Sequence, residues 1–146
     1  MKTIYQKARE FRKKYPRTIA WRLDKHANIV EKHLHEGEEA LYVFCGQKNV
    51  SSFMFNKSCV VAITNERLVI GQKRLLWGYF FTTITPDQYN DFKVINNLIW
   101  SDILIDTLDE EVYISNLDPN GAIEIQKHIT KFMMEEKKKY ATKKDK

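Results

Sequence analysis

The chain begins with two segments in which apolar residues recur every three or four positions, the period of an amphipathic helix. The first segment has its apolar side chains at Ile4, Ala8, Phe11 and Tyr15. Pro16 cannot continue a helix interior, so we expect a first short helix to end there. From Arg17 the same period returns, at Ile19, Leu23, Ala27, Val30 and Leu34. This pattern predicts a second helix, with Gly37 as its left-handed cap.

From residue 39 the helical period gives way to short β-branched and aromatic runs separated by turn residues. Seven runs are expected to be strands: 39–48, 56–64, 67–73, 76–85, 89–96, 98–107 and 111–117. The connections are short, with Asn96-Asn97 as an expected hairpin tip and Asp109-Glu110 as a further turn. Short connections of this kind favour an antiparallel meander.

The four residues Thr64-Asn65-Glu66-Arg67 separate the second and third runs. Asn65 is of a type that tolerates a positive φ in a tight turn, and the Thr64 hydroxyl can bond to nearby backbone amides. Arg67 is expected to fix the hairpin, by bonding carbonyls or a nearby acid, in preference to contacting a ligand. We therefore interpret this stretch as a bend between strands and not as a chemical site.

A terminal helix is expected after the last strand, because Asp118 is a good N-cap and Pro119 suits the first helical position. Its apolar stripe consists of Ala122, Ile125, Ile129 and Phe132, widened by Ile123 and Met133. A stripe of that breadth predicts a helix lying on a core. Residues 135–146 have the composition of a fraying, solvated tail.

Seven antiparallel strands followed by one helix resemble the pleckstrin-homology (PH) superfold. The stretch "AITNERLVI" (62–70) looks like the hairpin motif of bacterial PH-like domains, particularly the YokE-like group. The step "GEE" (37–39) and the strand 112–117 are similar to other features of that group. The resemblance covers residues 37–134. It implies an α+β fold, a PH-like seven-stranded antiparallel roll or barrel closed by a C-terminal helix.

On this interpretation residues 1–36 form an N-terminal helical extension of two helices, 37–134 the PH-like domain and 135–146 a basic C-terminal tail. The length of 146 residues and 43% hydrophobic content suit one domain. No run of about eighteen apolar residues and no signal peptide is visible, so a cytoplasmic location is expected. The two cysteines, Cys45 and Cys59, are expected to be small buried hydrophobes.

The net charge of +5 is unevenly distributed along the chain. Residues 1–17 hold seven Lys or Arg against one Glu, net +6, and residues 137–146 hold six Lys against one Asp, net +5. The body therefore carries −6. Basic ends of this kind suit either an anionic partner or simple solvation.

In eukaryotic relatives that bind inositol phosphates, the loop between the first two strands supplies a dense Lys/Arg cluster. Here that loop offers only Lys48 and Lys57, with Lys73 and Arg74 as supplements from the next loop. Specific phosphoinositide recognition is therefore not expected. Phe53 and Phe55 lie in the same segment, where they either insert into a membrane or partner or begin the second strand.

The sequence does not favour catalysis, a metal or a cofactor. His26, His33 and His35 form no pair at a four-residue spacing and no recognised ligand pattern. The serines have no neighbouring histidine, and none of the five glycines lies in a phosphate-binding loop. We therefore expect a binding protein and not an enzyme.

The favoured function is a scaffolding module with a protein partner, in which the N-terminal helices cap the domain or mediate assembly into a homo-oligomer. Trp21 is a candidate anchor for either contact. The alternative is a peripheral module steered to anionic membranes by the basic termini. Nucleic acid is not expected as a partner, because the body is acidic.

Overall fold

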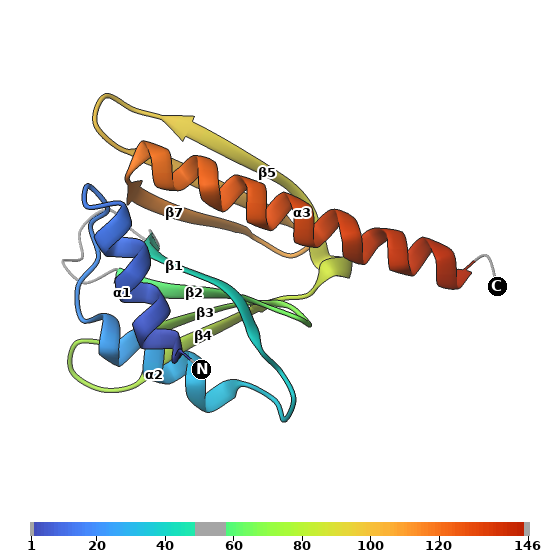
Figure 1. Ribbon diagram of the computed structural model, residues 1–146, viewed down its shortest axis with the longest axis horizontal. Coiled ribbons are helices and arrows are strands. Elements are labelled where there is room, and N and C mark those ends of the chain that lie inside the picture. Colours follow the sequence, from blue (N-terminus) through green and yellow to red (C-terminus); the bar gives the residue numbers. More distant parts are fainter. Residues whose placement is uncertain (1, 49–57, 145–146) are drawn as a thin grey trace.

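The computed structural model describes residues 2–48 and 58–144 of the chain. Within them lie three α-helices and a seven-stranded sheet, with a 3₁₀ turn η1 (Pro86–Gln88) between the fourth and fifth strands (Figure 1). The helices are α1 (Ile4–Lys14), α2 (Leu23–His33) and α3 (Pro119–Lys144). The strands are β1 (Ala40–Lys48), β2 (Ser58–Thr64), β3 (Leu68–Lys73), β4 (Tyr79–Ile84), β5 (Tyr89–Asn96), β6 (Ser101–Thr107) and β7 (Glu111–Leu117).

The sheet has the order β4-β3-β2-β1-β7-β6-β5, and every pairing is antiparallel. β1 pairs with β2 along nearly its whole length. Its described pairing with β7, however, joins only Gln47 to Ser115 and Lys48 to Ile114. β4 and β5 are the two edges of this sheet and do not pair with each other. The predicted seven-stranded antiparallel fold is confirmed, as an open roll that does not close into a barrel.

α2 lies directly on the outer face of β2 and β3. A Cβ added at Gly71 in β3 would lie 2.7 Å from the carbonyl oxygen of His26 and 2.8 Å from Val30 Cγ2. Only glycine therefore permits this close approach. All seven residues of β2 are buried, because α2 covers one face of the strand and the interior of the roll covers the other.

α1 fills the space beside β1 where β7 diverges. It is held at its start by a capping box, in which Thr3 and Gln6 bond reciprocally. The ring of Phe11 lies 6.1 Å, centre to centre, from that of Phe44 in β1, and the Lys7 ammonium donates to the Ala40 carbonyl at 2.7 Å. The apolar stripes of both N-terminal helices thus pack on their own sheet.

The second helix begins six residues later than the periodicity predicts. Arg22 adopts the left-handed conformation (φ 55°, ψ 41°), so the helical hydrogen bonds start only after it. Gly37 has the expected positive φ of 78° but does not cap the helix. It lies three residues beyond the Leu34 cap, in a turn closed by the Glu38 N–H donating to the His35 carbonyl at 3.0 Å. Both expectations about the helix boundaries were therefore wrong.

α3 begins at Pro119 as predicted, where the Asp118 carboxylate accepts from the Asn120 N–H at 3.0 Å. Its buried stripe consists of Ala122, Ile125, Ile129, Phe132 and Met133. Ile123 was wrongly included in the stripe, since half of it is exposed. The helix continues to Lys144 instead of fraying after residue 134, and its last part extends past the strands (Figure 1). None of the helices described is long and apolar enough to cross a bilayer.

Two turns also differ from expectation. Asn65 does not adopt a positive φ. Instead it bonds to the start of β1, since its side-chain oxygen accepts from the Glu39 N–H at 2.9 Å and its own N–H donates to the Glu39 carbonyl at 3.0 Å. The hairpin between β5 and β6 turns over residues 97–100, so β6 begins at Ser101 and not at Leu98.

Candidate functional site

The hairpin between β3 and β4 ends in a group of exposed, large apolar side chains. The turn over residues 74–78, which we call the β3–β4 tip, is closed by the Arg74 N–H donating to the Gly78 carbonyl at 3.1 Å. The exposed fractions of Leu75, Leu76 and Trp77 are 62%, 78% and 73%. Three consecutive apolar side chains left in water at a turn are a candidate contact surface.

Apolar exposure continues from the tip into the first residues of β4. Tyr79 and Phe80 are neighbours in this strand, so their side chains point to opposite faces of the sheet. Both are about half exposed, and the Arg74 guanidinium lies over the Phe80 ring at 5.5 Å. The hairpin therefore exposes apolar side chains on both of its faces. A flat apolar patch would expose them on one face only.

Two further segments lie at the same end of the roll. The connector between α1 and α2 runs along it, with the Trp21 N–H donating to Ser58 Oγ at 2.9 Å and the Trp100 indole donating to the Arg17 carbonyl at 2.8 Å. Leu98 in the β5–β6 turn is fully exposed. Both hairpin turns lie at the left of Figure 1. We call residues 17–22, 73–80 and 97–100 together the turn end.

The turn end is positively charged although the body of the chain is acidic. Its three segments contain Arg17, Arg22, Lys73 and Arg74, and they contain no Asp or Glu. Arg74 is exposed, and Lys73 is partly exposed at the base of the tip. The surface thus combines exposed apolar side chains with cations, which suits an anionic surface that has an apolar interior.

Two histidines of α2 hold the base of this hairpin. The His26 imidazole is buried, and its Nδ1 accepts from the Lys73 N–H at 2.8 Å. His33 stacks on Phe81 with ring centres 4.2 Å apart and lies 3.2 Å from the Tyr79 hydroxyl. Burial, aided by the nearby charge of Arg22, lowers the pKa of His26 from its ordinary 6.5 to about 4.

This lowered pKa predicts a loss of stability in mild acid. Between pH 6.5 and 4 the unfolded chain takes up a proton at His26 that the folded chain does not. The stability contributed by neutral His26 is therefore fully present above pH 6.5. The free energy of unfolding falls as the pH is lowered, by up to about 3 kcal/mol at pH 4. Urea unfolding measured at pH 7, 6 and 5 tests this, with His26→Asn as a variant that accepts the Lys73 hydrogen bond without titrating. An equally steep loss in that variant would contradict the assignment.

The structure brings some of the predicted contact residues together. Arg74 lies in the tip and Lys73 directly precedes it, and Trp21 is half exposed on the neighbouring connector. Lys48 ends β1 and is partly buried, with its ammonium donating to the Thr82 hydroxyl at 3.1 Å. Three other candidates lie outside the residues that the structure describes: Phe53, Phe55 and Lys57.

The sequence interpretation missed Leu75, Leu76 and Trp77. The predicted strand 76–85 includes Leu76, Trp77 and Gly78, whereas β4 begins only at Tyr79. Gly78, with a φ of 81°, was the available signal of a turn, because a β-strand interior disfavours glycine. No polar turn residue accompanies it, so the turn was not recognised.

At the opposite end of β2 and β3, Glu38 and Arg67 form a buried ion pair. Arg67 Nε and Nη2 donate to the two carboxylate oxygens at 3.0 Å each, and the Thr64 hydroxyl donates to one of them at 2.6 Å. Arg67 Nη2 also donates to the His33 carbonyl at 2.9 Å. The prediction that Arg67 bonds carbonyls or a nearby acid is confirmed. Burial raises the pKa of Glu38, but the hydrogen bonds from Arg67, His35 and Thr64 outweigh it and lower the pKa to about 2. The pair fixes the hairpin to α2 and to the start of β1.

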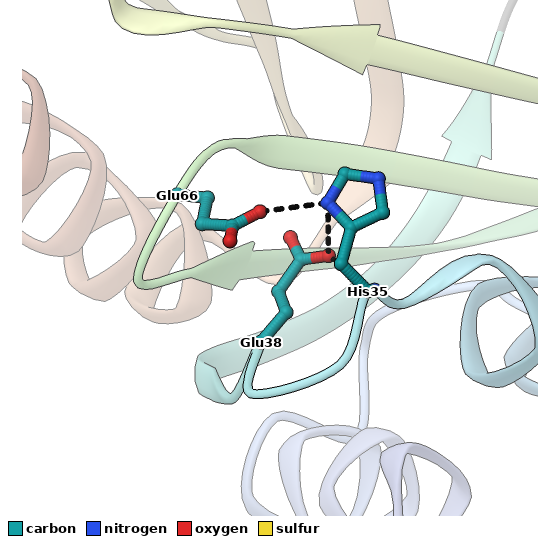
Figure 2. A group of neighbouring side chains, drawn as sticks. All are labelled: His35, Glu38 and Glu66. Atoms are coloured by element: carbon teal, nitrogen blue, oxygen red, sulfur yellow. Dashed lines mark hydrogen bonds and ion pairs between the residues drawn. The ribbon is translucent and has the colours of Figure 1, made fainter.

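His35 and Glu66 extend this cluster toward solvent (Figure 2). His35 Nδ1 lies 2.8 Å from a Glu66 oxygen and 3.6 Å from Glu38 Oε1, a separation that a shared cation would tolerate. The Glu38 oxygens are already bonded by Arg67, Thr64 and the His35 N–H. A cation would have to displace these donors and lie near the guanidinium. The group therefore suits a structural role and does not suit a metal site.

Comparison with known proteins agrees with this architecture. A family model described as "Bacterial PH domain" matches residues 34–131. The pleckstrin homology domain from Shewanella amazonensis SB2B is similar in structure, with a TM-score of 0.50 and 15% identity over 79% of this chain and 91% of that chain. A DUF1696 family protein with a pleckstrin-homology domain from Shewanella loihica PV-4 has a TM-score of 0.47 and 15% identity, covering 75% and 95%. No curated protein matches the sequence.

Proposed function

The chain belongs to the bacterial PH domain family, and we propose that it is a non-catalytic binding module that docks on anionic membrane surfaces through its turn end. The observation that carries this proposal is the composition of that surface. Leu75, Leu76 and Trp77 project from a hairpin, within segments that hold four cations and no acid.

The shape of the tip favours insertion into a lipid bilayer over contact with a flat protein surface. Tyr79 and Phe80 are exposed on opposite faces of the same hairpin, so a flat partner pressed against one face would leave the other in water. Entry into the boundary between headgroups and acyl chains would cover both faces. Full burial of a leucine or a similar side chain contributes roughly 1.5–3 kcal/mol.

The cations strengthen the same contact. Lys73 and Arg74 lie at the base of the tip, at the level where lipid phosphates would lie if Leu76 and Trp77 entered the apolar layer. Each Lys or Arg near an anionic surface contributes about 1 kcal/mol, and salt weakens this attraction. The acidic body would be repelled from the same surface, which favours an orientation with the turn end toward the lipid.

Vesicle co-sedimentation tests the proposal. We expect the full chain to bind phosphatidylcholine vesicles that contain phosphatidylglycerol at low salt, and to bind pure phosphatidylcholine vesicles much less. Leu76→Glu should lower the partition coefficient at least about tenfold, because it removes apolar burial and adds repulsion. Leu41→Glu is the matched control, since Leu41 is also more than half exposed but lies in β1 away from the turn end.

The Leu41→Glu control distinguishes binding through the turn end from nonspecific binding through any exposed apolar side chain. Equal losses in Leu76→Glu and Leu41→Glu would remove the assignment to the turn end. No binding of the full chain to anionic vesicles, even at low salt, would reject the proposal. The exposed tip would then be assigned to a protein partner, which the sequence alone favoured.

Two finer assignments accompany this proposal. The hairpin motif over residues 62–70 supports placing the chain in the YokE-like group of bacterial PH-like domains. A location at the cytoplasmic face of a membrane is consistent with the two free, buried cysteines, Cys45 and Cys59.

A further inference from the structure

α1 carries an unbalanced row of cations beside an open groove of about 600 Å³. Lys2 in this groove pairs with Glu10. Arg9, Arg12 and Lys13 also line it, and none of them has a carboxylate partner in residues 2–48 and 58–144. Cations three and four positions apart repel each other on a helix, so this face gains from an anionic partner.

Acidic residues form a row across β5, β6 and β7. Asp91 in β5 lies directly opposite Asp106 in β6, and Asp106 lies directly opposite Glu111 in β7. Directly opposed side chains share one face of a sheet, and like charges in such positions destabilise it. No ion pair in the described structure neutralises any of the three. We call Asp91, Asp106 and Glu111 the acidic row.

The two charged surfaces have matching spacings. Arg9 is three positions from Arg12 and four from Lys13, and side chains at those separations on a helix lie about 5–6 Å apart at Cβ. Directly opposed residues on neighbouring strands lie about 4.5–5.5 Å apart at Cβ. We propose that the acidic row of one copy docks in the α1 groove of a second copy, where it meets Arg9, Arg12 and Lys13.

This contact joins different surfaces of the two copies. A pair of copies therefore keeps one free groove, on the first copy, and one free row, on the second, so association continues into a chain or a closed ring. The α1 groove lies in the N-terminal extension and the acidic row lies within residues 34–131, so the contact needs both the extension and the part that matches the family model. Exposed ion pairs are individually weak, so we expect association at high protein concentration and low salt.

Sedimentation velocity without lipid tests the proposal. We expect the mean mass of the full chain to grow with concentration up to about 1 mM in about 0.01 M salt, and to return to the monomer in about 1 M salt, where screening is short-ranged. Arg12→Glu/Lys13→Glu should remain monomeric in low salt, and so should Asp106→Lys/Glu111→Lys. Lys127→Glu/Lys131→Glu, two exposed lysines of α3 away from the groove, should associate like the wild type.

Mixing the groove variant (Arg12→Glu/Lys13→Glu) with the row variant (Asp106→Lys/Glu111→Lys) distinguishes complementary docking from a general effect of net charge. The groove variant retains its acidic row and the row variant retains its groove. Unlike charges then meet at both contacts between different variants, so the mixture should associate into alternating chains or rings although neither variant associates alone. A chain carrying all four reversals should associate again, because the complementarity is exchanged. Thermal melts verify that each variant is folded.

Three results would overturn the proposal. One is a wild-type mass that stays monomeric at low salt and high concentration. Another is association that persists when either surface alone is reversed. The third is a mixture of the reversed variants that forms no complex although both are folded. Vesicle binding does not enter this experiment, so its outcome is independent of the proposed membrane contact.

Discussion

Replacing Arg67 with alanine should lower the free energy of unfolding by about 3–5 kcal/mol at pH 7. The Glu38 carboxylate is completely buried and depends on this guanidinium for two of its hydrogen bonds. Without Arg67 the carboxylate is left as a buried charge without a counter-ion. The Thr83 hydroxyl and the His33 carbonyl also lose the donor that joins them. Urea unfolding followed by circular dichroism measures the change.

Two comparisons make this result specific. Lys2→Met breaks the exposed Lys2–Glu10 pair and should change stability by less than about 1 kcal/mol. The double variant Glu38→Leu/Arg67→Met removes both charges and should recover much of the loss seen in Arg67→Ala. A loss of under about 1 kcal/mol in Arg67→Ala would show that the pair does not stabilise the hairpin.

Removing residues 1–36 should abolish cooperative folding of the remaining chain. The two helices in this segment contribute five large buried side chains: Ile4, Phe11, Leu23, Ile29 and Val30. At roughly 1.5–3 kcal/mol each, their burial is comparable to the 5–15 kcal/mol that stabilises a whole domain. The outer face of β2 and β3 would also be exposed to water. Thermal unfolding of fragment 37–146 should therefore be broad, with binding of a hydrophobic dye at room temperature.

The separate N-terminal segment provides the control. A peptide of residues 1–36, added to the fragment, should restore a cooperative transition if the helices act only by packing on the sheet. A fragment that melts as sharply as the full chain, without the peptide, would show that residues 37–146 fold independently.

Local chemistry allowed the sheet and its closing helix to be predicted. The hydroxyl of Thr64 accepts from the N–H groups of Glu66 and Arg67, as its residue type predicts. Asp118 and Pro119 set the start of α3 because capping depends on neighbours in sequence. The predicted strands 89–96 and 111–117 match β5 and β7. Short-range signals were sufficient for these elements.

The errors arose where contacts distant in sequence determine the outcome. Asn65 was assigned a turn conformation, but its side chain instead bonds to Glu39, which precedes it by 26 residues. The rhythm from Arg17 to Leu23 suggested a helix, yet the connector bonds Ile19 to Asn116 in β7. The apolar residues of the β3–β4 tip looked like core because a pattern does not distinguish apolar residues that a fold buries from those that it leaves in water.

α1 connects the two halves of the sheet. Among the described residues β1 and β7 share only two paired positions, and η1 lies in the covalent link between the half containing β4 and the half containing β5. α1 spans both halves, since Phe11 packs on β1 and Lys14 bonds Glu124 of α3 at 2.8 Å. Sliding of one half over the other would therefore strain an N-terminal segment that family comparison leaves unmatched. The helix that bridges the two halves thus lies outside the residues that match the family model.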